Sequence, residues 1–161
     1  MTGLELFTAF HVLISLIGIV TGVIVLMDML SGRRRAGWTA AFLATTILTS
    51  VTGFLFPRDH VVPAHVVGVL SLVVLAVACW ALYGRRLAGA WRAWYVVTAL
   101  LALYLNVFVA VVQAFQKVPA LRRLAPTQSE GPFQIAQLAV LALFVVLAVR
   151  ALRRFRPVAA A

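Results

Sequence analysis

The sequence predicts an all-α protein, an integral membrane helical bundle that forms one domain over residues 1–161. Hydrophobic residues make up 64% of the chain and charged residues 11%, whereas a soluble domain is about half apolar and about a quarter charged. The apolar residues form segments of about 20 residues or more, the length that a helix needs to cross the hydrocarbon core. The basic residues fall in short runs between these segments, a pattern typical of polytopic membrane proteins.

Five transmembrane helices are expected. They cover roughly Leu6–Leu30, Trp38–Phe56, Pro63–Tyr83, Trp91–Phe115 and Phe133–Leu152. The segment before the first span has no basic residue, and no small-residue cleavage site precedes Arg33. We therefore expect a retained helix and not a cleaved signal peptide. The connector over residues 116–132 contains three prolines, which prevent one continuous helix, so it is expected to form short amphipathic turns.

The first two spans carry small and hydroxyl residues at helical spacing. On the first span, Gly18 and Gly22 form a small-xxx-small pattern that lets helix backbones approach, within the bundle or between copies. The second span has two adjoining stripes: Thr45, Thr49, Thr52 and Thr46, Ser50, Gly53. Hydroxyls can bond to the carbonyl one turn earlier or across to another helix. We expect the second helix to be the most buried of the five, and a hydrated polar pathway is the alternative.

The fourth span brings amides into the bundle. Asn106 and Gln113 lie seven residues apart on one face, and Lys117 continues that stripe one turn further. An amide at mid-span is costly against lipid, so Asn106 should face the bundle interior.

The distribution of basic residues predicts the orientation. Ten of the 14 follow the first, third and fifth spans, and four lie on the other side. Because cytoplasmic connectors carry the excess of Lys and Arg, we expect the amino terminus outside and the carboxyl terminus in the cytoplasm. Asp28, at the expected cytoplasmic end, should pair with the run Arg33–Arg35. The same runs account for the net charge of +10, so nucleic acid is not an expected partner.

All three histidines are expected in one thin outer layer. His60 lies in the outer loop, and His65 starts the third span two residues after Pro63. His11 lies about five residues into the first span, or ~7–8 Å below its outer end at 1.5 Å per residue. Neutral imidazoles at this depth need partners. We therefore expect an outward-facing pocket in which His11 and His65 face each other, with Gln113 close by.

This pocket would bind a haem, a transition metal or a small redox molecule such as a quinone. The candidate ligands are His11 and His65, with His60, Asp59 and Glu130 as additional donors. Two imidazoles suit haem iron (haem b), and imidazoles with a carboxylate suit zinc or copper. Three histidines exclude a two-haem b-type cytochrome, which needs at least four. The competing interpretation is that these polar groups only reach from the interface to water.

Two other functions remain open. The first is a small homo-oligomeric channel or transporter, whose route the polar side chains would line: Thr45, Thr49, Thr52, Asn106, Gln113 and Lys117. The second is an accessory subunit of a larger membrane complex. A nucleophile–base pair and a pair of close carboxylates are both missing from the pattern, and Cys79 is the single cysteine. An enzyme is therefore the least favoured class.

Four stretches of the sequence resemble segments of known proteins: TSVTGFLFP, YLNVFVAVVQAF, KVPAL and LAPTQSE. In these stretches, and nearly from end to end, the chain resembles a family of small bacterial polytopic inner-membrane proteins. The resemblance implies a multi-pass protein of the bacterial inner membrane. No activity is attached to that family, so the resemblance implies no catalytic residue.

Overall fold

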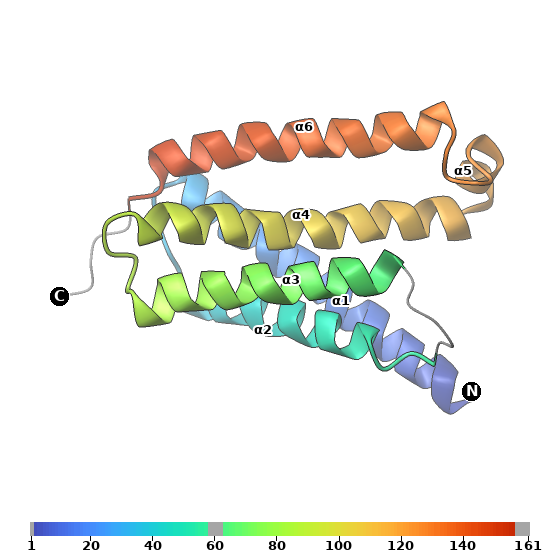
Figure 1. Cartoon of the computed structure of the whole chain (residues 1–161), viewed down its shortest axis with the longest axis horizontal. Helices are drawn as coiled ribbons and strands as arrows, with labels where there is room; N and C mark the ends of the chain where they lie inside the picture. The colour runs from blue at the N-terminus through green and yellow to red at the C-terminus, as the bar shows by residue number, and fades with distance from the viewer. Residues whose placement is uncertain (1, 58–62, 157–161) are drawn as a thin grey trace.

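The computed structural model describes residues 2–57 and 63–156, and this part of the chain is helical without a strand (Figure 1). The elements in order are α1 (Gly3–Leu30), α2 (Ala36–Gly53), α3 (Pro63–Cys79), the π-helical turn η1 (Trp80–Gly84), α4 (Trp91–Lys117), α5 (Pro119–Leu124) and α6 (Gly131–Arg154). The long helices run in alternating directions, so the start of α1 and the end of α6 lie at opposite ends of the bundle (Figure 1). The expected all-α bundle is confirmed.

Four helices are long and apolar enough to cross a membrane. They are α1, α3 continued by η1 (His65–Gly84), α4 and α6. The fifth expected span, α2, has 18 residues but is not among them. The threonines, serine and glycines of α2 lower its mean hydropathy below that of α1 and α3, the helices on its two sides.

The bundle has two chemically different ends. We call residues 31–35, 84–90 and 153–156 the arginine-rich end, and residues 2–11, 53–57, 65 and 113–131 the histidine end. In Figure 1 they lie at the left and at the right of the bundle.

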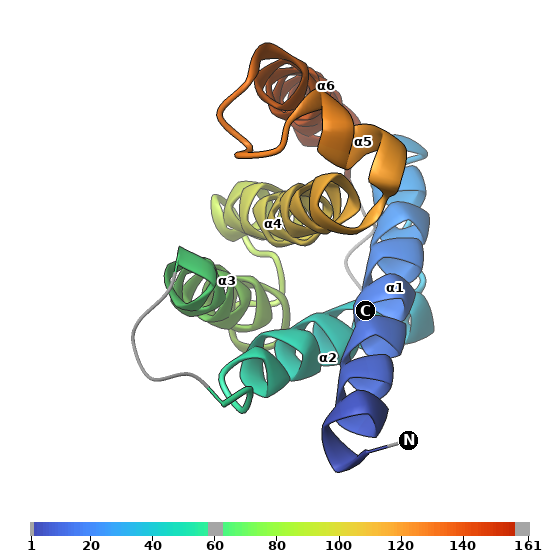
Figure 2. The same cartoon turned by 90° about the vertical axis from the view of Figure 1, so that its right-hand side faces the viewer.

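The central helix of the bundle is α4. The expectation that α2 is the most buried helix is therefore wrong. α4 packs against α1, α2, α3 and α6, whereas α2 lies at the edge of the bundle and contacts mainly α1 and α3 (Figure 2). In the most apolar 18 residues of α4, 44% are buried, whereas six of the 18 residues of α2 are buried. Lipid is as apolar as a helix interior, so hydropathy does not indicate which helix is central. Small residues such as Ala99 and Ala102 let neighbours approach α4 closely.

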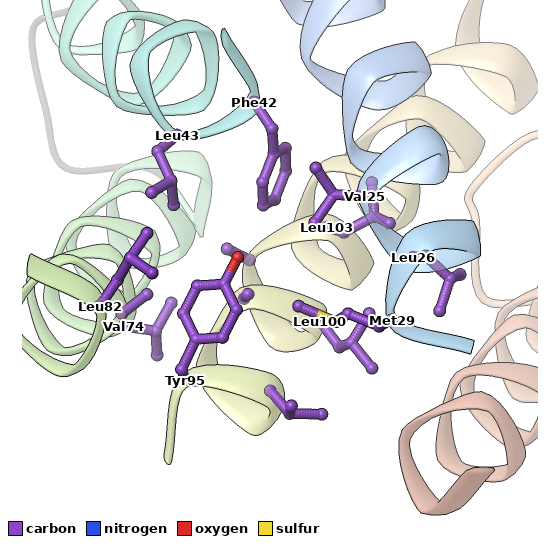
Figure 3. Close-up of a cluster of buried hydrophobic side chains, with 14 of the residues drawn as sticks. Val25, Leu26, Met29, Phe42, Leu43, Val74, Leu82, Tyr95, Leu100 and Leu103 are labelled. Atoms are coloured by element: carbon purple, nitrogen blue, oxygen red, sulfur yellow. The ribbon is translucent and has the colours of Figure 1, made fainter. Parts of the chain in front are cut away.

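The main apolar core lies toward the arginine-rich end. It draws on α1, α2, α3, η1, α4 and the end of α6, and Figure 3 shows its members Val25, Leu26, Met29, Phe42, Leu43, Val74, Leu82, Tyr95, Leu100 and Leu103. Between apolar helices in lipid, such contacts stabilise the fold mainly through close packing of side chains.

Candidate ligand site at the histidine end

His11 lies where α1 meets the end of α2. Its half-buried ring accepts or donates one hydrogen bond at Nδ1, which lies 2.7 Å from Thr52 Oγ1. The ring meets Phe56 edge-on, with 5.1 Å between the ring centroids. A Cβ atom on Gly53 would lie 3.8 Å from His11 Cε1, so the small residue leaves room for the imidazole.

The hydrogen bonds of Thr52 favour one of the two neutral tautomers of His11. Thr52 Oγ1 has one proton, which it donates to the carbonyl oxygen of Leu48 at 2.8 Å, with Thr49 O at 3.1 Å. With that proton on Leu48 O, Thr52 Oγ1 acts as the acceptor and His11 Nδ1 as the donor, which is the tautomer that we adopt for the neutral ring. In the neutral ring, this leaves a lone pair on Nε2. Metal-binding histidines are commonly oriented in this way, by a hydrogen bond from the other ring nitrogen.

His65 has different neighbours from His11. Its ring is half-buried and stacks on Phe54, with 5.6 Å between centroids and 11° between planes. α2 lies between α1 and α3 (Figure 2), so the two histidines approach the end of α2 from the helices on its two sides. The other two candidate donors from the outer loop, Asp59 and His60, lie outside the described residues.

α4 contributes a charge beside His11 and an amide deeper in the bundle. Lys117 is close enough to His11 to interact with it electrostatically. Gln113, expected near the histidines, has an exposed side chain. Asn106 faces the bundle interior and donates from Nδ2 to Thr46 Oγ1 at 3.4 Å.

Gly18 and Gly22 lie at close contacts inside the bundle. A Cβ atom on Gly18 would lie 3.4 Å from Asn106 Nδ2 and from the hydroxyl oxygens of Thr45 and Thr46. At Gly22 the space is filled by apolar side chains, because Leu103 Cδ1 would be 2.5 Å away. Because the two glycines have no side chain, α1 can pack closely against α2 and α4 at these positions.

The remaining hydroxyls of α2 are used mainly within the helix. Thr45 Oγ1 donates to Ala41 O at 2.7 Å, and Ser50 Oγ to Thr46 O at 3.0 Å. Thr49 Oγ1 is buried without a hydrogen-bond partner among the described residues. Of these side chains, Thr45 lies beside Gly18 of α1.

Glu130 is engaged by its own loop. Its carboxylate accepts from Thr127 Oγ1 at 2.8 Å and from the backbone N–H groups of Thr127 and Ser129, both at 3.1 Å. Desolvation of the carboxyl group opposes ionisation, but these hydrogen bonds outweigh it and lower the pKa of Glu130. The side chain thus stabilises the turn that precedes α6.

Two glutamines that sequence reasoning missed tie this region together. Gln128 Nε2 donates to the carbonyl oxygen of Val112 at 3.1 Å, and Gln137 Nε2 to that of Phe108 at 3.2 Å. Gln137 interrupts an apolar span, which is the signal that could have found it. The bond of Gln128 holds the loop after α5 against the central helix α4, and the bond of Gln137 holds α6 against it.

The fold and this end of the bundle define an all-helical protein with four helices suited to cross a membrane and polar side chains collected between α1, α2 and α4. Within residues 2–57 and 63–156, three or more His, Cys, Asp or Glu side chains nowhere gather in a group that could hold a metal ion. No family model, no curated protein and no solved structure matches the chain.

Proposed function

We propose that this is a multi-pass protein of the bacterial inner membrane that binds a small redox ligand at the histidine end, with Nε2 of His11 as the contacting atom. The observation that carries the proposal is the 2.7 Å hydrogen bond between His11 Nδ1 and Thr52 Oγ1. The hydroxyl of Thr52 donates its own proton to Leu48 O. This arrangement orients the ring and leaves Nε2 as an electron-pair donor. Thr52 thus supports His11 as a positioning residue.

The donor set favours two kinds of ligand within this class. One imidazole is enough for an axial bond to haem iron, and it is enough to accept a hydrogen bond from the hydroxyl of a quinol. A closed zinc site takes about four protein ligands, more than the described residues supply here. Lys117, whose charge acts on His11, would favour an electron-rich or anionic group on the ligand.

The proposal includes α2 as the fifth span. At about 1.5 Å per residue its 18 residues are ~27 Å long, close to the ~30 Å hydrocarbon core. The helix also packs against the apolar spans α1 and α3 (Figure 2).

The tryptophans support the same orientation as the basic residues. Trp38, Trp80 and Trp94 lie toward the arginine-rich end and are exposed, which suits an interfacial aromatic belt there. The amino terminus and the histidine end would then face outward. In a Cys79→Ala background, Ala120→Cys should react with an impermeant thiol reagent from outside, and Ala88→Cys only from the cytoplasm. Both alanines are exposed, so reversed labelling would overturn the orientation.

The ligand is tested on protein purified from its native membrane in mild detergent. We expect either a Soret absorbance band or a stoichiometric quinone in the lipid extract. His11→Ala should abolish it, and Thr52→Val should weaken it about tenfold, because the ring loses its orienting bond.

Ser15→Ala is the matched control. Ser15 lies one turn from His11 and donates from Oγ to the carbonyl of its own helix, at His11 O, so its loss should leave the ligand bound. Purified protein that contains neither haem nor quinone, or that keeps either one after His11→Ala, would contradict the proposal. An accessory subunit or a channel would then be the better explanation.

A further inference from the structure

The connector between α4 and α6 forms two adjoining open hollows. The first, of about 340 Å³, is lined by Phe115, Gln116, Arg122, Pro126, Thr127 and Gln128. The second, of about 380 Å³, lies beside it and is lined by Lys117, Pro119, Arg122, Arg123 and Pro126. Arg122 and Pro126 border both. The pair of hollows is thus one continuous basic surface around α5.

The three cations of this surface form no ion pair with a carboxylate in the described part of the chain. Lys117, Arg122 and Arg123 are exposed, and in the described part of the chain the one ion pair joins Arg35 to Asp28 at the opposite end. The described acids of the histidine end are both committed to helix starts. Glu5 accepts from Thr2 N at 2.8 Å in a capping box, and Glu130 holds its own turn.

The position of the surface favours a lipid over a soluble ion. Lys117 is the last residue of α4, and α5 follows at once, so the cations lie at the level where the apolar helices end. None of the residues of α5 is buried, and the apolar side chains of Val118 and Leu124 beside the cations are 44% and 56% exposed. A short amphipathic segment of this kind lies in the boundary between headgroups and acyl chains.

We propose that the basic surface around α5 binds the phosphate group of an anionic phospholipid. The guanidinium groups of Arg122 and Arg123 would donate to the phosphate oxygens, for which the planar fork of arginine is well matched. The amide group of Gln116 lines the same hollow and can contact the glycerol or headgroup. The exposed Val118 and Leu124 would contact the acyl chains.

The test compares two double variants in bilayer nanodiscs of phosphatidylcholine doped with phosphatidylglycerol, with retained lipid counted by native mass spectrometry. Arg122→Gln/Arg123→Gln should retain at least about fivefold less phosphatidylglycerol, since a basic residue near a membrane contributes about that factor. The matched control, Arg153→Gln/Arg154→Gln, removes two exposed charges from the other end. Lys117 is left in place because it lies beside His11, so ligand binding at His11 is read separately.

Two results would overturn the proposal. Equal losses from both double variants would mean that charge attracts lipid without a site. A rise in melting temperature on adding inorganic phosphate in pure phosphatidylcholine, as large as that with phosphatidylglycerol, would assign the hollow to a soluble anion. Equal melting temperatures of all three proteins in phosphatidylcholine would show that the variants are folded.

Discussion

The two ends of the bundle differ in how tightly their elements are held. At the arginine-rich end, Arg92 donates to the carbonyl oxygens of Leu152 and Phe155, at 3.0 and 2.7 Å, and so caps α6. Phe155 is fully buried against Tyr95, and Asp28 pairs with Arg35 as the sequence predicts. This end is closed by contacts between elements far apart in the chain.

The histidine end has fewer buried residues, and its long-range contacts, such as His11 with Thr52 and Gln128 with Val112, are joined by many local ones. The first buried residue of α1 is Ile14, and α5 has none. Its hydrogen bonds run largely within single turns, such as the loop of Glu130 and the capping box of α1. Low packing density is typical of regions that bind and release ligands. We therefore expect the stability of the fold to depend more on the arginine-rich end, and the proposed ligand binding to depend on the histidine end.

The largest effect is expected from a substitution that disrupts the packing of α1 against α2 and α4 between the two ends. Gly22→Leu should destabilise the protein by about 3 kcal/mol or prevent its folding, because a side chain there would collide with Leu103 and Phe42. The measurement is thermal unfolding in detergent with size-exclusion chromatography. Gly37→Leu is the control, since a Cβ atom on Gly37 would have nothing within 4 Å. Equal melting temperatures for the two variants would show that the α1 contact is unimportant.

A smaller effect is expected from opening the arginine-rich end alone. Arg92→Ala removes two hydrogen bonds from a charged donor and leaves carbonyl groups of α6 without partners, a loss of about 2 kcal/mol. Arg153→Ala, an exposed arginine in the last turn of α6, should cost little. Unfolding that is the same for both variants would mean that the capping bonds do not stabilise this end.

Some of these features could be predicted from the sequence and others could not. The fourth and fifth spans were expected at Trp91–Phe115 and Phe133–Leu152, and the helices are Trp91–Lys117 and Gly131–Arg154. Apolar length alone determines such elements. α2 ends at Gly53, three residues before the expected Phe56, because the chain turns after the glycine.

The rotation of each helix about its own axis could not be predicted from the sequence. Depth along a helix follows from counting residues, so His11 and His65 could be assigned to one end. Which residues they meet depends on rotation about the helix axis, and spacing does not determine this. His11 meets Thr52 and His65 meets Phe54, partners that only the packed structure reveals. The central place of α4 was missed for a related reason, since lipid-facing and helix-facing surfaces are equally apolar.

The smallest expected effect concerns the pH dependence of the loop before α6. The hydrogen bonds from Thr127 and Ser129 lower the pKa of Glu130 below its ordinary value of 4.5. A carboxyl group whose pKa is lower in the folded state stabilises that state above the ordinary pKa, and this contribution is lost as the pH falls through the folded pKa. The Thr127 and Ser129 amide resonances should therefore titrate with a midpoint below pH 4.5. Thr127→Val, which removes the hydroxyl donor and keeps the backbone N–H, should raise that midpoint toward the ordinary value. Glu130→Gln should abolish the titration and leave the bonds of Arg92 at the other end unchanged, because the loop is held by its own residues. If the midpoint lies at or above 4.5 in the unmodified chain, the loop does not hold the carboxylate, and Glu130 becomes available again as a donor to a bound ligand.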